Sequence, residues 1–156
     1  MKLKRYILYI VGMLLLFPVA KAAEPLTENE DARLQTLVWD LHPAVYLDKS
    51  ELKVYGDNPV VLFVDAASIK MLAGAQEAFE DVELITLKLR SAKEESAKIN
   101  VSQLKAFTNL KYILVQYEYD ACGNGIDTCL DKKADAAVTL PTDSNVEVLY
   151  QLSIPQ

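Results

Sequence analysis

The feature that most constrains the fold is a near-repetition in the middle of the chain. Residues 78–87, AFEDVELITL, are followed 28 positions later by residues 106–115, AFTNLKYILV. Both copies place apolar residues at steps of three, three and two. These residues are Phe79, Val82, Ile85 and Leu87, and then Phe107, Leu110, Ile113 and Val115. The spacing is typical of a helix end that runs through a short corner into a buried strand, so it predicts two successive helix–strand units.

The neighbouring segments continue this alternation of strand and helix. The expected elements are strands at 60–64, 82–89 and 110–119, and helices at 66–79, capped by Ser68, and from about residue 91. The first of these strands is a continuous apolar run, which is typical of burial on both faces of a sheet. Crossovers of this length join parallel strands. The predicted fold class is therefore α/β, a single domain over residues 23–156 with a mainly parallel sheet and helical crossovers.

The two ends of the chain add a helix and shorter strands. Residues 26–41 predict a helix, because Thr27 and Glu30 have the spacing of a capping box and an apolar stripe follows. The stripe consists of Leu34, Leu37, Val38 and Leu41. Alternating apolar residues over 45–54 predict a hairpin with its turn at 48–50. Further strands are expected at 138–140 and 145–152.

The apolar ladder of the repeat resembles that of leucine-rich repeats, whose pattern is L-x-x-L-x-L-x-x-N at periods of about 20–29 residues. Leu104 extends the ladder of the second copy by one more step of three. The asparagine of the family pattern is replaced by Arg90 in the first copy and by Glu118 in the second. The resemblance covers about residues 76–119 and implies, as the alternative fold, a short irregular solenoid with a concave binding face. A solenoid requires strands that follow chain order, whereas a strand inserted out of order would exclude it.

The N-terminus has the pattern of a cleaved signal peptide, residues 1–22. Basic residues precede an apolar run of 14 residues, 6–19, and the small residues Ala20 and Ala22 mark a cleavage site. A bilayer core requires about 20 apolar residues, so we expect no membrane-spanning segment after cleavage. The signal predicts an exported protein, either periplasmic or extracellular.

Charge excludes one large class of partner. Cleavage after Ala22 removes four of the 16 basic residues and none of the 22 acidic ones, which leaves 12 against 22 and a net charge of −10. A nucleic-acid-binding protein needs a basic surface to neutralise phosphates. We therefore expect no nucleic-acid partner.

Both cysteines, Cys122 and Cys129, lie in the exported part of the chain, where the oxidising compartment favours a disulfide. Their segment, residues 120–135, has little apolar content and is expected to be an exposed loop. The acidic side chains of this loop are oxygen ligands of the kind that calcium takes. Their spacing does not match an EF-hand, so a solvated loop is favoured and no metal site is predicted.

The sequence lacks the usual marks of catalysis. It contains no P-loop, no G-x-G-x-x-G and no G-x-S-x-G, and its two cysteines lack the C-x-x-C spacing of redox enzymes. The single histidine, His42, is expected to have a structural role at a helix end. No catalytic residue and no cofactor are predicted.

In the repeat interpretation, one face of the central strands is a binding surface. Thr86, Lys88, Tyr112 and Gln116 alternate with the buried positions of their strands and so lie together on the opposite face. The competing interpretation is that helices bury this second face.

We therefore expect an exported, non-catalytic binding or interaction protein whose partner is a protein or an envelope component. The alternative is a small exported enzyme whose active site cannot be identified from the sequence. An enzyme should have a deep pocket with convergent polar groups, and a binding module should have a broad flat or concave patch.

Overall fold

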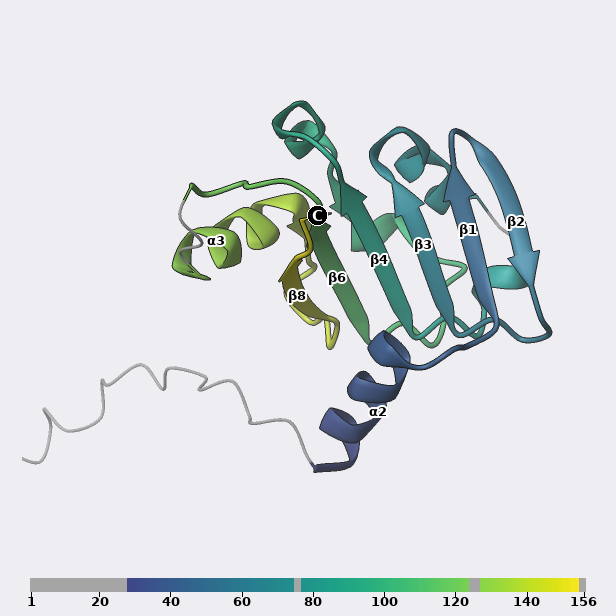
Figure 1. The fold of residues 1–156 in the computed structure, drawn as a ribbon. Coiled ribbons are helices and arrows are strands. Elements are labelled where there is room, and N and C mark those ends of the chain that lie inside the picture. Colours follow the sequence, from purple (N-terminus) through teal and green to yellow (C-terminus); the bar gives the residue numbers. More distant parts are fainter. Residues whose placement is uncertain (1–27, 75–76, 124–126, 155–156) are drawn as a thin grey trace, which may run out of the picture. The chain divides into compact units, whose positions relative to one another are not determined.

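The computed structural model describes residues 28–74, 77–123 and 127–154 (Figure 1). The chain divides into two compact units, residues 1–31 and residues 32–156. Of the first unit only residues 28–31 are described, as the beginning of helix α2 (Glu28–Trp39). The predicted signal peptide and Thr27 of the predicted capping box lie outside the described residues.

The second unit contains a mixed, mostly parallel sheet of six strands in the order β2-β1-β3-β4-β6-β8. The strands are β1 (Ala44–Asp48), β2 (Glu51–Tyr55), β3 (Val61–Asp65), β4 (Leu84–Leu89), β6 (Tyr112–Tyr117) and β8 (Glu147–Leu152). Only β2 is antiparallel to its neighbour, because it forms the predicted hairpin with β1. The other five strands are parallel and follow chain order across the sheet. The mainly parallel α/β sheet predicted from the sequence is confirmed.

The crossovers are mostly 3-10 helices: η1 (Ala66–Ala73), η2 (Glu77–Phe79), η3 (Ala92–Ser96) and η4 (Val101–Gln103). The continuous helix predicted at 66–79 is therefore wrong. Apolar side chains at Ile69 and Leu72 are three apart, which suits the three-residue turn of a 3-10 helix. Ser68 was also wrong as the cap, since Asp65 caps η1 by accepting a hydrogen bond of 2.9 Å from the backbone N–H of Ser68.

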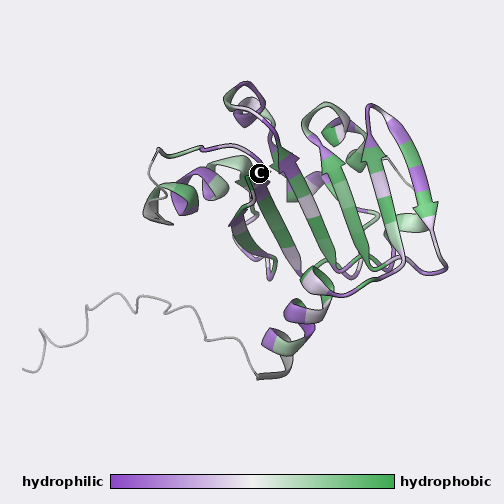
Figure 2. Cartoon of the chain, in the orientation of Figure 1, coloured by the Kyte–Doolittle hydropathy of each residue, from purple (hydrophilic) through white to green (hydrophobic). Residues whose placement is uncertain are grey.

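The sheet buries apolar side chains on both faces. One face, which we call the core face, packs against the crossovers and holds Val45, Leu47, Leu62, Val64, Ile85, Leu87, Ile113, Val115 and Tyr117. The other, which we call the α2 face, packs against Leu34, Leu37 and Val38 of α2. Figure 2 shows the central strands as predominantly hydrophobic, with hydrophilic bands on β2 and on α3 (Asp127–Ala137). Leu41, predicted to continue the helix stripe, is fully exposed because α2 ends at Trp39.

The two copies of the repeat lie side by side and contact each other at equivalent positions. β4 and β6 pair with an offset of 28 residues, from Leu84 beside Tyr112 onward. The buried rings of Phe79 and Phe107 stack with their centroids 4.7 Å apart and an interplanar angle of 16°. The two sequence repeats therefore form adjacent units whose equivalent residues contact each other.

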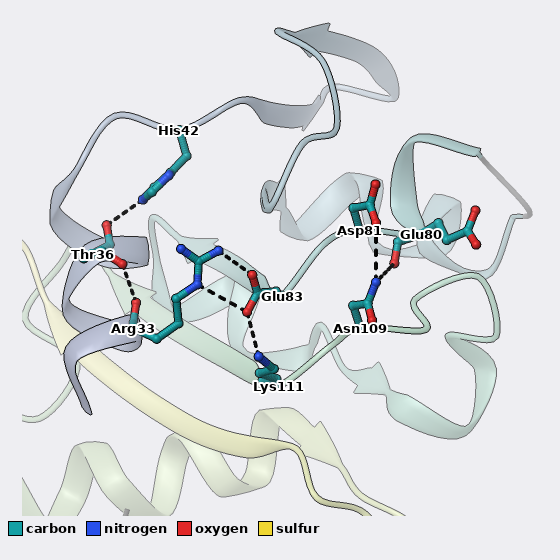
Figure 3. Close-up of polar contacts among 8 residues, drawn as sticks. All are labelled: Arg33, Thr36, His42, Glu80, Asp81, Glu83, Asn109 and Lys111. Atoms are coloured by element: carbon teal, nitrogen blue, oxygen red, sulfur yellow. Dashed lines mark hydrogen bonds and ion pairs between the residues drawn. The ribbon is translucent and has the colours of Figure 1, made fainter. Parts of the chain in front are cut away.

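Polar contacts follow the same offset. The hydroxyl of Thr108 donates to the backbone carbonyl of Glu80 over 3.1 Å. The ammonium of Lys111 donates to the carboxylate of Glu83 over 2.9 Å (Figure 3). Each donor lies 28 positions after its acceptor, so the second copy binds to the first along its polar edge as well as through its core.

The cysteine segment differs from the predicted exposed loop. Residues 127–137 form α3, and the apolar residues Leu130, Ala134 and Ala137 on one side of this helix are buried. The carboxylate of Glu95 holds the helix by accepting from the Lys133 ammonium at 2.6 and 2.7 Å. Strand β7 (Val138–Thr139) follows the helix and pairs in parallel with β5 (Ile99–Asn100), which confirms the strand expected near residue 138.

The predicted disulfide between Cys122 and Cys129 is confirmed. It joins the segment after β6 to the first turns of α3, with the two Cα atoms 6.0 Å apart. Because Cys122 follows β6 in the chain, the bond ties the beginning of α3 to the segment that leaves the sheet.

Replacing Phe107 with alanine tests the stacking of the two copies. We expect Phe107→Ala to lower the free energy of unfolding by about 3–5 kcal/mol, since it removes a buried ring and leaves a cavity against Phe79. Tyr55→Ala, which removes an exposed ring, should cost less than about 1 kcal/mol. Urea denaturation measures both values, and equal losses would contradict the stacking.

Replacing both cysteines tests the contribution of the bridge. The double substitution Cys122→Ser and Cys129→Ser should lower the free energy of unfolding by roughly 2–3 kcal/mol, because the unfolded chain regains the conformational entropy that the closed loop removes. Wild-type protein treated with a reducing agent should match the double variant. A variant as stable as the oxidised wild type would show that the bridge does not stabilise the fold.

Candidate functional site

The candidate site is a hollow of about 520 Å³ on the α2 face, beside the hairpin. We call it the aromatic hollow. It is lined by Leu41, His42, Ala44, Tyr46, Asp48, Lys53 and Tyr55. It exists because the chain leaves α2 at Trp39, passes Leu41 and His42, and then enters β1.

Two aromatic rings, Tyr46 and Tyr55, line this hollow, and Phe63 continues their row beyond it. The ring centroid of Tyr46 lies 5.5 Å from that of Tyr55, edge to face, and 4.9 Å from that of Phe63, in a stacked arrangement. Tyr55 is 57% exposed and Tyr46 is 39% exposed, while Leu41 is fully exposed. Large apolar side chains gathered at one place on a surface are typical of an interaction site.

A second, smaller hollow of about 170 Å³ lies next to the first and shares Tyr46 and Asp48 with it. We call it the polar hollow. It is lined by Tyr46, Leu47, Asp48, Phe63, Val64, Asp65, Lys88 and Arg90. The ammonium of Lys88 lies 5.1 Å from the centroid of the Phe63 ring, a cation–π distance. The Arg90 guanidinium lies 3.5 Å from the Asp48 carboxylate.

The turn of the hairpin that carries Tyr46 and Tyr55 is fixed by hydrogen bonds to two buried polar side chains, Asp65 and Ser68. Lys49 and Ser50 have positive φ angles of 51° and 63°, as a two-residue hairpin turn of type I′ requires. The Asp65 carboxylate accepts from the N–H of Lys49 at 3.1 Å, and the Ser68 hydroxyl accepts from the N–H of Ser50 at 2.9 Å. Burial opposes the ionisation of Asp65, but hydrogen bonds from Ser68 and Lys49 lower its pKa. These hydrogen bonds therefore hold the turn against the end of β3.

The helix that borders the hollow is held by Glu83 (Figure 3). The carboxylate of Glu83 accepts from the Arg33 guanidinium on α2 and from the Lys111 ammonium before β6. Its hydrogen bond with Arg33 lowers the pKa of Glu83, burial opposes this, and Lys111 lowers it further. At the other end of the helix, Nε2 of His42 donates to the carbonyl of Thr36 over 2.8 Å. His42 therefore has the structural role at a helix end that was expected.

The four residues predicted for the binding surface lie on the α2 face, but they are not equally accessible. Lys88 and Gln116 are partly exposed and lie beside each other on β4 and β6. Thr86 is 2% exposed and Tyr112 is 3% exposed. Tyr112 is buried beneath α2, as the competing interpretation required. Only Lys88 belongs to the hollows described above. A binding role for Thr86, Lys88, Tyr112 and Gln116 stays a prediction.

The aromatic hollow was missed from the sequence. Its one local signal is the hairpin, in which Tyr46 and Tyr55 point to the same side as Lys53 by strand alternation. The contribution of Leu41 and His42 depends on where α2 ends, which only the packed structure gives.

No protein-family profile, curated protein or solved structure matches this chain. Among the described residues, no three histidine, cysteine or carboxylate side chains are grouped closely enough to hold a metal ion. In the same part of the chain, no helix has the length and apolar character to cross a membrane.

We expect that lowering the pH weakens the contacts by which Glu83 holds α2 against the sheet. The lowered pKa means that ionised Glu83 stabilises the fold above the ordinary carboxyl pKa, about 4.3, and that this contribution is lost as the pH falls through the folded-state value. We expect Glu83→Gln to cost about 1–2 kcal/mol at pH 7, since Arg33 and Lys111 are partly exposed to solvent.

The difference between Glu83→Gln and wild type should shrink toward pH 3, as measured by urea denaturation across this range. Glu80→Gln is the matched control, because the side chain of Glu80 is exposed and only its backbone carbonyl accepts hydrogen bonds from the second copy. A difference that stays constant from pH 7 to pH 3 would show that Glu83 does not act through its charge.

Proposed function

We propose that this chain is an exported, non-catalytic binding protein that recognises a protein or an envelope component through the aromatic hollow. The observation that supports this best is the exposure of large apolar side chains around the hollow. Leu41 is fully exposed, and Trp39, at the end of α2, is 67% exposed. Complete burial of such a side chain by a partner contributes roughly 1.5–3 kcal/mol to the free energy of binding, because its apolar surface is removed from water.

The composition of the hollow supports a macromolecular partner. Tyrosine and tryptophan are the residues most enriched where binding energy concentrates in interfaces, because they offer large area with little conformational freedom to lose. The charged side chains of Asp48 and Lys53 also line the hollow. Protein interfaces combine apolar area with polar groups in this way.

Export is supported by the N-terminal pattern and by the disulfide. The bond between Cys122 and Cys129 persists in an oxidising compartment and is rare in the cytosol. We therefore propose that the signal peptide is cleaved and that the mature protein acts in the periplasm or outside the cell.

We further propose that the sheet is a short, irregular solenoid of the leucine-rich-repeat kind. Its support is the chain-order arrangement of the parallel strands and the contacts between equivalent positions of the two copies. In this arrangement the α2 face corresponds to the concave side on which such solenoids bind. Helix α2 covers the part of this face that holds Tyr112, and Lys88 and Gln116 stay partly exposed on the rest of it.

The alternative, a small exported enzyme, has one observation in its favour. Asp48, Lys88 and Arg90 gather in the polar hollow at the carboxyl ends of β1, β3 and β4. Ligands of parallel α/β sheets bind at that end of the strands. The aromatic hollow is larger and more apolar than this site, so binding remains the favoured function.

Capture of partners from the envelope fraction of the source cell tests the proposal. The protein is expressed from the full-length sequence, immobilised, and compared with the variants Leu41→Ser and Tyr55→Ala. Each variant should weaken binding of the captured partner by about tenfold or more, as removal of an anchoring side chain does. Affinities are then measured with the purified partner.

Ile154→Ser is the matched control, since Ile154 is also an exposed apolar residue and lies near the C-terminus, outside the hollow. It should bind like wild type. If the hollow variants bind as wild type does and Lys88→Ala does not, the binding site is the polar hollow. If none of these variants changes binding, the α2 face is not the site.

A further inference from the structure

The outer edge of β2 is the exposed edge of the sheet. All the residues of β2 except Leu52 are exposed. At the opposite edge, the residues of β8 are mostly half-buried and α3 packs against the strand. In Figure 1 the outer side of β2 faces no other strand, and within the described residues β1 is its only neighbour in the sheet. An exposed edge of this kind is a template for pairing with another strand.

The hairpin turn determines which backbone groups of β2 face outward. A two-residue turn is closed by a hydrogen-bonded pair, here Asp48 and Glu51, and such pairs alternate along an antiparallel ladder. Glu51, Lys53 and Tyr55 therefore direct their backbone groups to β1. Leu52 and Val54 direct theirs away from the sheet.

The charges of β2 are arranged symmetrically around Leu52. Glu51 and Lys53 flank it, lie on the same face of the strand, and have side chains that are 70% and 60% exposed. If a second copy of β2 lies antiparallel with its Leu52 opposite the first, Glu51 of each copy lies opposite Lys53 of the other. Opposite charges in directly facing positions stabilise a strand pair, and like charges destabilise it.

Other antiparallel registers lack this match. A symmetric pair centred on Lys53 places two ammonium groups opposite each other. A pair centred on Val54 places Lys53 opposite Tyr55, and Glu51 then faces no lysine of the other copy. A lysine on an edge strand usually discourages pairing. In the register centred on Leu52, however, Glu51 of the other copy faces Lys53 and balances its charge.

We propose that two copies of this chain associate through their β2 strands, antiparallel, with the two-fold axis at Leu52. The outward backbone groups of Leu52 then exchange hydrogen bonds with those of the second copy, and two Glu51–Lys53 ion pairs flank them. The six strands of each copy become one continuous sheet. An interface made by a single strand is small, so the dimer is weak and depends on concentration.

The symmetry has a consequence for the aromatic hollow, whatever that hollow binds. A two-fold axis through facing antiparallel strands is perpendicular to the sheet, so both copies present the α2 face on the same side. The dimer therefore carries two hollows side by side, which would raise the avidity for a partner with repeated features.

Sedimentation equilibrium of protein expressed from the full-length sequence tests the proposal at concentrations up to about 1 mM, where even a millimolar dimer is populated. Glu51→Lys places lysines against Lys53, and Lys53→Glu places glutamates against Glu51. Each variant should raise the dimer dissociation constant by about tenfold or more, because both symmetric pairs become repulsive. Lys132→Glu, a charge reversal on the exposed side of α3, should leave it unchanged.

Mixing gives the decisive measurement. Equimolar Glu51→Lys and Lys53→Glu should restore association to about the wild-type level, because each lysine of one copy then faces a glutamate of the other. The double variant Glu51→Lys/Lys53→Glu should self-associate like wild type. Circular dichroism checks that each variant is folded.

Three outcomes would overturn the proposal. The wild-type protein could remain monomeric at every concentration. It could form a dimer that neither single variant weakens, which would place the interface elsewhere. The mixed variants could remain monomers, which would show that Glu51 and Lys53 do not face each other; pairing of β2 with an extended peptide of another protein would then be the remaining use of this edge.

Discussion

The stacking of one repeat copy on the other, at equivalent positions, is the constraint on which the rest of the structure depends. It combines a buried aromatic pair, Phe79 and Phe107, with hydrogen bonds from Thr108 and Lys111 to the preceding copy. Because these contacts share one offset, they fix the register of β4 and β6. A slip of one residue would turn every side chain of a strand to the wrong face. The division of the sheet into a core face and an α2 face follows from this register.

Helix α2 covers only part of the α2 face, and the uncovered part beside the hairpin forms the candidate binding surface. Leu37 covers the amino ends of the central strands, where Leu84 and Tyr112 are buried. The helix does not cover the hairpin side, and there Tyr46 and Tyr55 stand partly in solvent. Glu83 binds α2 and the second copy at once, so the covered part of the face and the stacking of the repeat share one carboxylate.

The strands of the large sheet could be predicted from the sequence, whereas the helices and the site could be predicted only in part. Runs such as residues 61–64 are apolar without interruption and fit no exposed element. Steps of three, as from Ile69 to Leu72, fit a 3-10 helix as well as an α-helix, so the pattern could not separate them. Helix α3 was missed because its buried side is largely made of alanines, Ala134 and Ala137, which give little hydrophobic contrast. The burial of Tyr112 depends on where a distant helix packs, which local spacing does not contain.

The distance along the chain between paired strands grows steadily across the sheet. From Ala44 to its partner Val61 it is 17 residues, and the following partners are 23, 28 and 35 residues further on. Within the parallel part of this sheet, each new strand therefore pairs with the strand of that part that precedes it in the chain, while β2 lies on the outer side of β1. Parallel sheets usually fold slowly because their pairings span long stretches of chain. Here the first hairpin is local and every later strand adds to a finished edge, so folding can advance from one end of the sheet to the other in the order in which the chain is made.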